Sequence, residues 1–179
     1  METTRKKALE NMQKGFVSYK LVLEGWDVSD HLGDGFDLFA EKANSPPVKI
    51  ELKAIDLKSI KEGHNATQHL SANEIVTATH LIITVFEGIE MKDNYIMSIQ
   101  QFVENSGVKK YGDYSSFENF VQEYKRSATA KSQRVKNSDI EKKRLDFDFN
   151  FNPSNAEEWK LAKFKDKWEY LNPKELTKP

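Results

Sequence analysis

Residues 81–86, Leu-Ile-Ile-Thr-Val-Phe, form an apolar run rich in β-branched residues. Such a run is typical of a β-strand that is covered on both faces, because it lacks the polar alternation of a half-exposed strand. A strand of this kind needs neighbouring strands and further elements packed above and below the sheet. The run therefore predicts an α/β fold in which helices flank a central mixed sheet.

A β-hairpin is predicted upstream of this run. Residues 36–41 and 48–54 both alternate apolar with polar side chains, and an Asn-Ser-Pro-Pro turn separates them. Asp37 and Glu51 then lie on adjacent strands and point the same way. Shorter strands are predicted at residues 26–28 and 95–99.

A helix is predicted over residues 4–24, ahead of the hairpin. Its large apolar residues recur at spacings of three and four, which places them on one stripe of a helix. These residues are Leu9, Met12, Phe16, Tyr19 and Leu23. Gly25 follows where a helix end favours a left-handed residue, so the helix is expected to stop there.

The remaining elements follow from capping and spacing. Ser71 with Glu74 three residues later forms a capping box, which predicts a helix over residues 71–79. Residues 55–70 lack periodicity and predict a polar loop. Beyond residue 105, helices are predicted at residues 115–126 and 154–170 and a short strand at 146–151.

Composition limits the class of protein. The 179 residues suit one domain with appendages, and the aromatic fraction of 11% exceeds what a disordered chain would carry. The absence of Cys excludes disulfides, thiolate zinc sites and cysteine nucleophiles, and it fits a cytoplasmic protein. No run approaches the roughly 18 apolar residues of a membrane span, so no membrane partner is expected.

The net charge of −1 conceals opposite local charges. Residues 125–144 carry eight bases and two acids, with small polar residues between them. We expect a folded core at residues 1–105 and a C-terminal helical and basic extension at 106–179 that packs on the core or on a partner. Bases that contact phosphates without reading sequence are expected at Lys58, Lys61, His64, Lys131, Arg134 and Lys136. The alternatives are exposed loop residues at Lys58, Lys61 and His64, and a solvated linker farther on.

The predicted hairpin brings two carboxylates together. Two like charges a few ångströms apart are poorly tolerated unless a cation lies between them, so Asp37 and Glu51 predict a site for Mg²⁺ or Mn²⁺. Lys53 shares the face of Glu51, where its ammonium group could orient or help to deprotonate a water and offset charge on a phosphate. The alternative is a solvated surface charge pair.

These residues carry a resemblance to a known family. Gly35-Phe36-Asp37 followed by Ile50-Glu51-Leu52-Lys53 resembles the PD-(D/E)XK, or restriction-endonuclease-like, nuclease superfamily over roughly residues 8–100. The resemblance implies Mg²⁺-dependent phosphodiester hydrolysis. It also implies that Asp37 and Glu51 bind the metal with the Ile50 backbone carbonyl, and that Lys53 is the catalytic lysine.

The chain departs from the family at the first helix. Many such nucleases have a further Glu there, near the position of Ser18 or Tyr19, and neither residue is a carboxylate. Glu10 lies one or two turns earlier. The departure leaves room for a site that binds nucleic acid without cutting it.

The sequence therefore predicts a Mg²⁺-dependent deoxyribonuclease of the restriction, repair or junction-resolving type. Because duplex cleavage needs two cuts, a homodimer or a subunit of a larger complex is expected. The alternatives are an inactive nuclease-fold module that binds nucleic acid and a protein-interaction subunit.

Overall fold

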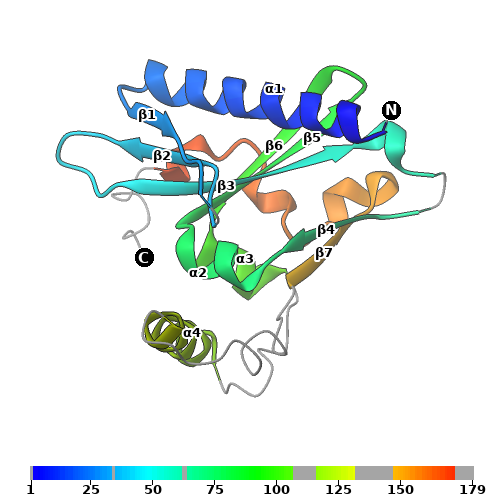
Figure 1. Ribbon diagram of the computed structural model, residues 1–179. Helices are drawn as coiled ribbons and strands as arrows, with labels where there is room; N and C mark the ends of the chain where they lie inside the picture. The colour runs from blue at the N-terminus through cyan, green and yellow to red at the C-terminus, as the bar shows by residue number, and fades with distance from the viewer. Residues whose placement is uncertain (1, 34, 62–63, 107–115, 132–146, 172–179) are drawn as a thin grey trace.

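The computed structural model describes residues 2–33, 35–61, 64–106, 116–131 and 147–171. A five-stranded sheet with the order β1-β2-β3-β5-β6 forms its centre (Figure 1). β3 and β5 are parallel and the other neighbouring pairs are antiparallel, so the sheet is mixed. The strands are β1 (Asp27–Asp30), β2 (Leu38–Glu41), β3 (Val48–Asp56), β5 (His80–Glu87) and β6 (Glu90–Ser98).

Helices cover both faces of the sheet, which confirms the expected mixed α/β fold. α1 (Glu2–Leu23) crosses one face, while α2 (Ala72–Thr77) and α3 (Ile99–Asn105) lie on the other (Figure 1). In β5, Ile82 packs on the α1 side, and Ile83 packs on the opposite side. The strand predicted from residues 81–86 is therefore covered on both faces, as expected.

The buried side of α1 differs from the predicted stripe. The helix buries Leu9, Val17 and Leu21, which recur at multiples of four residues. Gln13 completes this row and is also fully buried. The expectation of one apolar stripe was wrong, because Met12, Tyr19 and Leu23 of that stripe are exposed.

Residues 55–70 hold more regular structure than the predicted loop. β3 continues to Asp56, and the 3₁₀ turn η1 (Leu57–Ser59) follows it. β4 (Ala66–Leu70) pairs antiparallel with β7 (Phe147–Phe151), far away in the sequence. The backbone N–H and C=O groups of β4 need hydrogen-bond partners, and β7 supplies them. The local sequence around β4 does not indicate such a distant partner.

The C-terminal part also differs from expectation. α4 (Phe117–Lys131) confirms the helix predicted over 115–126 and extends it. The long helix predicted over 154–170 is instead a series of 3₁₀ turns at Pro153–Glu158, Ala162–Phe164 and Trp168–Leu171. Asn155 and Asp166 leave the helical backbone region within this segment, with φ of −139° and 53° respectively.

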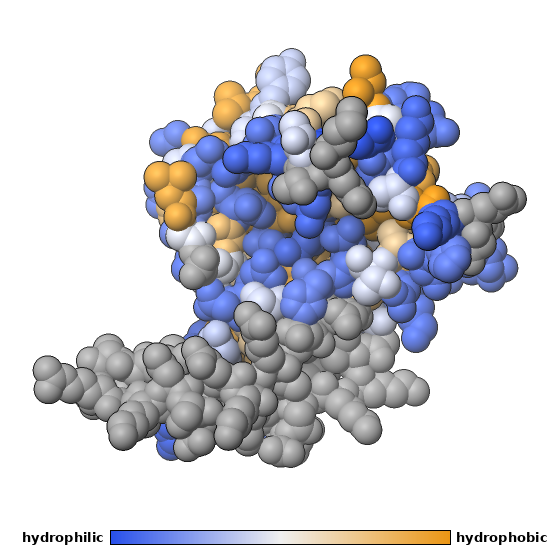
Figure 2. Space-filling view, turned by 45° about the vertical axis from the view of Figure 1, so that its right-hand side comes forward, coloured by the Kyte–Doolittle hydropathy of each residue, from blue (hydrophilic) through white to orange (hydrophobic). Residues whose placement is uncertain are grey.

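The surface is mostly hydrophilic on the face drawn in Figure 2, where hydrophobic residues form separate groups. Among the described residues, no helix is both long and apolar enough to cross a membrane. The phosphate contacts predicted at Arg134 and Lys136 lie outside the described residues, as does the side chain of Lys131 at the end of α4.

Candidate active site

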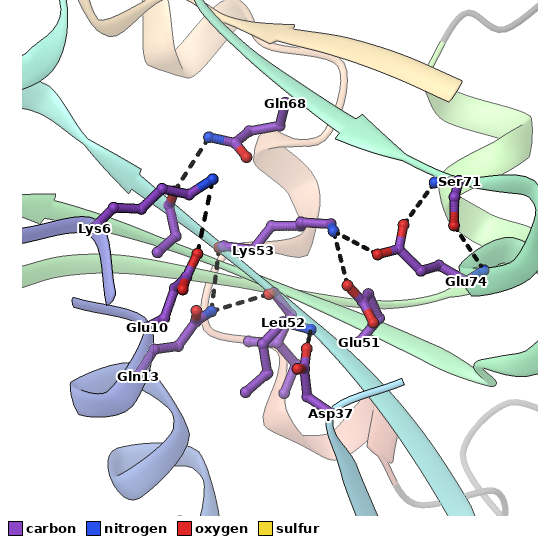
Figure 3. Close-up of polar contacts among 12 residues, drawn as sticks. Lys6, Glu10, Gln13, Asp37, Glu51, Leu52, Lys53, Gln68, Ser71 and Glu74 are labelled. Carbon is purple, nitrogen blue, oxygen red and sulfur yellow. Dashed lines mark hydrogen bonds and ion pairs between the residues drawn. The ribbon is translucent and has the colours of Figure 1, made fainter. Parts of the chain in front are cut away.

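A cleft of about 640 Å³ opens between α1, β3, β4 and α2. Asp37, Glu51 and Lys53, which the sequence singled out, all line it (Figure 3). The wall from α1 carries Lys6, Lys7, Glu10, Asn11, Gln13 and Lys14. The predicted residues are thus brought together, and the side chains of α1 were not anticipated beyond Glu10.

Asp37 is positioned by the backbone of the neighbouring strand. It directly precedes β2, and its backbone N–H donates to the Ile50 carbonyl at 2.8 Å. Its carboxylate oxygen Oδ2 accepts the Leu52 N–H, also at 2.8 Å. Two bonds to β3 therefore hold this half-buried carboxylate beside the centre of that strand.

Glu51 is buried in the cleft floor, with 5% of its surface exposed. Burial raises the pKa of its carboxyl to about 8, with Asp37 and Glu74 also raising it and Lys53 opposing them. Its Oε1 lies 2.8 Å from Lys53 Nζ. Glu51 therefore favours protonation near neutral pH unless a cation stabilises its charged form.

Lys53 lies between two carboxylates rather than beside one. Its Nζ donates to Glu74 Oε1 at 3.0 Å, in addition to its contact with Glu51 (Figure 3). Burial alone would lower the pKa of Lys53, but the two carboxylates outweigh it and raise this pKa. Lys53 is consequently a positive charge in this cleft.

Glu74 was identified in the sequence only as part of a capping box. That prediction is confirmed, since the Ser71 hydroxyl accepts the Glu74 N–H and Glu74 Oε2 accepts the Ser71 N–H at 2.6 Å. The same carboxylate reaches Lys53 with its other oxygen. Sequence reasoning missed this third carboxylate because its capping role already explained it.

Gln13 connects α1 to the middle of β3. Its Nε2 lies 3.2 Å from the Lys53 carbonyl oxygen, 3.1 Å from that of Ile82 and 2.9 Å from Thr84 Oγ1. Its Oε1 is buried without a hydrogen-bond partner among the described residues. Glu10 also lines the cleft, where it forms an ion pair with Lys6 at 3.8 Å.

The other predicted phosphate contacts lie outside this cleft. Lys61 and His64 are exposed and line a second hollow, which shares Thr67 and Gln68 with the first. The Lys58 side chain lies against Gly88 in the turn between β5 and β6. Lys61 and His64 therefore remain candidates for an extended contact, whereas Lys58 lies apart from both hollows.

An oxygen-ligated cation fits the donor set. Within the described ranges, no group of three or more His, Asp and Glu side chains is placed to hold a metal ion. Mg²⁺, however, is commonly bound through one or two carboxylates, with waters and substrate phosphates completing its shell. Asp37 and Glu51 meet that requirement. Burial, with a smaller contribution from repulsion by Asp37 and Glu74, raises the Glu51 pKa, and a bound cation would offset both effects by stabilising the charged carboxylate.

Comparisons with known proteins give weak similarities. No family model and no curated protein matches the chain. A bacterial homing endonuclease, I-Ssp6803I, aligns with 72% of this chain and 98% of its own, at 17% identity and a TM-score of 0.40. Hjc, a Holliday junction resolvase from Archaeoglobus fulgidus, aligns with 51% of this chain and 73% of its own, at 14% identity and a TM-score of 0.35. At these TM-scores, a function has to be inferred from the chemistry of the cleft.

Proposed function

We propose that the protein is a metal-dependent endonuclease that hydrolyses DNA phosphodiester bonds in the cleft between α1 and β3. The observation that carries this proposal is the group formed by buried Glu51 and half-buried Asp37 and Lys53 on the cleft floor. An ammonium group beside two carboxylates would combine a cation site with a positive charge, both of which suit an anionic substrate.

Asp37 and Glu51 would hold the Mg²⁺ or Mn²⁺ ion. The Ile50 carbonyl, expected as a third ligand, already accepts the Asp37 N–H. Alternate residues of a strand direct their backbone groups to the same edge, so the Leu52 carbonyl faces the β2 side, as the Ile50 carbonyl does. β2 begins at Leu38, which pairs with Ile50, so no residue of β2 lies opposite Leu52. Leu52 is therefore the better candidate for the carbonyl ligand. A bound ion would supply Lewis acidity, by lowering the pKa of a coordinated water and neutralising charge on the phosphate.

The protein's own groups would orient the reactants. Lys53, held between Glu51 and Glu74, would direct its ammonium group toward the scissile phosphate and the attacking water. Lys6, Lys7 and Lys14 on the α1 wall would contact the flanking phosphates. Phosphate contacts of this kind hold a strand in place without reading its sequence.

Cleavage assays test this proposal. Linear, supercoiled and branched DNA should be cut in Mg²⁺ or Mn²⁺ and much more slowly in Ca²⁺, which binds oxygen ligands with looser geometry. Lys53→Met should remove most of the activity because it keeps the aliphatic chain and deletes the charge. Lys92→Met is the matched control, since Lys92 pairs with Glu87 and Glu90 at the β5–β6 turn.

A DNA-binding module without nuclease activity is the second candidate. It is favoured by one observation. The side chain that α1 presents to the centre of the sheet is the neutral amide of Gln13, and not the further carboxylate that many such nucleases have on this helix. Protein that binds DNA and Mg²⁺ yet leaves all three DNA forms intact would support this candidate and contradict the first.

A homodimer or a larger complex would give duplex cleavage two active sites. Sedimentation with and without a DNA duplex tests this part of the proposal, and a monomer on cleaved duplex would contradict it.

A further inference from the structure

We propose that Glu74 is a positioning residue, whose carboxylate holds the Lys53 ammonium group in place while Glu51 serves as a metal ligand. This inference rests on the proposed function, because it gives Lys53 a task at the same site. The juxtaposition that supports it is a single carboxylate shared between a helix cap and the ammonium group (Figure 3).

The two oxygens of Glu74 have different partners. Oε2 accepts the Ser71 N–H at 2.6 Å and thereby completes the N-cap of α2. Oε1 accepts from Lys53 Nζ at 3.0 Å. The cap immobilises the Glu74 side chain, so Lys53 is held by a group that is itself fixed to the backbone.

A second capping box in the same chain shows what the cap alone requires. At α3, the Ser98 hydroxyl accepts the Gln101 N–H at 3.1 Å, and Gln101 Oε1 accepts the Ser98 N–H at 2.8 Å. The geometry matches that at α2, with an uncharged amide in place of the carboxylate. A negative charge at residue 74 is therefore unnecessary for capping. The Glu74 carboxylate instead contacts Lys53 and also interacts with Glu51.

The need for such a partner follows from the position of Glu51. Lys53 Nζ lies 2.8 Å from Glu51 Oε1, so the ammonium group is in contact with this carboxyl group in the protein without metal. A cation bound by Glu51 competes with Lys53 for that carboxylate. Lysine has a flexible four-carbon chain, and it would lose its orientation if Glu51 were its only partner. Glu74 retains the ammonium group on the cleft floor.

The decisive variant is Glu74→Gln, which keeps an acceptor for the Ser71 N–H and removes the charge. We expect its melting temperature to stay close to that of the wild type. We expect kcat for DNA cleavage to fall at least tenfold, with KM changed less than about twofold. In a Lys53→Met background the same substitution should have no further effect on the rate. Glu104→Gln is the matched control, because Glu104 is an exposed carboxylate on α3.

Wild-type kcat in Glu74→Gln, in a protein that cleaves DNA, would overturn the inference and leave the proposed function intact. If the wild type cleaves no DNA, the proposed function fails separately, and stability then tests the contact. Urea midpoints of the wild type, both single variants and the double variant, measured in EDTA, should be non-additive. Additive midpoints would show that Glu74 does not hold Lys53.

Discussion

Glu51 has the most strongly shifted pKa of the carboxyl groups that line the cleft. The pKa of its carboxyl is about 8 in the folded protein, against 4.5 without burial. The folded state therefore favours the protonated form. This preference stabilises the metal-free protein fully below pH 4.5, and the stabilisation is lost as the pH rises through about 8.

We predict that Glu51→Gln makes the stability of the metal-free protein less dependent on pH. The wild type should lose stability between about pH 4.5 and 8 with a slope on the order of 1 kcal/mol per pH unit, and this slope should vanish above about pH 8. The variant, which has no proton to lose at this position, should show a flatter curve over the same range. Urea denaturation in EDTA at several pH values measures both slopes, and equal slopes would contradict the assignment to Glu51.

The residues that sequence reasoning found and missed differ in how local their signals are. Asp37, Glu51 and Lys53 could be predicted from the sequence because strand alternation assigns each side chain to a face of the sheet. Glu74 and Gln13 reach the same site from helices, and no local pattern indicates which strand a helix will contact. Their roles depend on how α1 and α2 dock on β3, which is a tertiary property.

Among the elements, α1 shows why spacing alone was misleading. Its apolar residues occupy two rows, and the row that faces the sheet contains Gln13, which interrupts the apolar pattern. Gln13 is buried because it bonds to β3 and β5 backbone groups. A buried polar residue with tertiary partners therefore concealed the true packing face.

Two leucines near the end of α1 allow a matched test of this packing face. Leu21 is 1% exposed and Leu23 is 65% exposed. We predict that Leu21→Ala destabilises the protein by about 2–5 kcal/mol, because it leaves a cavity against the sheet. Leu23→Ala should change stability by less than about 0.5 kcal/mol. Urea denaturation measures both values, and a larger effect at Leu23 would restore the stripe expected from the sequence.

The strands of the sheet were predictable only where the signal is local. The hairpin and the buried strand follow from local alternation, and β2, β3 and β5 lie where they were expected. The pairing of β4 with β7 joins segments far apart in the chain, as in the hydrogen bond between the Thr67 and Asn150 side chains. Neither segment alone indicates that partner.

Across the molecule as a whole, the charges on α1 set one wall of the proposed DNA path. Lys6, Lys7 and Lys14 line the cleft with Asp37 and Glu51 at its floor. A phosphate backbone that reaches the floor would pass these lysines. DNA contacts are therefore expected at the N-terminal helix, in addition to those predicted for the basic segment at residues 125–144.

We predict that replacing Lys6, Lys7 and Lys14 with Ala weakens DNA binding uniformly across sequences. The slope of log affinity against log salt should fall by about 0.9 for each phosphate that these lysines no longer neutralise. Binding measured by fluorescence anisotropy over a range of salt concentrations gives the slope. Replacing Lys163 and Lys167, which lie near the C-terminal turns, is the control, and equal slopes in the two variants would remove α1 from the binding surface.

The proposed active site is best tested by the rate at which the protein cuts DNA when Asp37 alone is changed. Single-turnover cleavage in Mg²⁺ should fall at least about 100-fold in Asp37→Asn, which is nearly isosteric and removes one of the two proposed metal ligands. Asp27→Asn, at an exposed position on β1, should cut at the wild-type rate. Cleavage by Asp37→Asn at the wild-type rate would show that the cleft between α1 and β3 is not the active site.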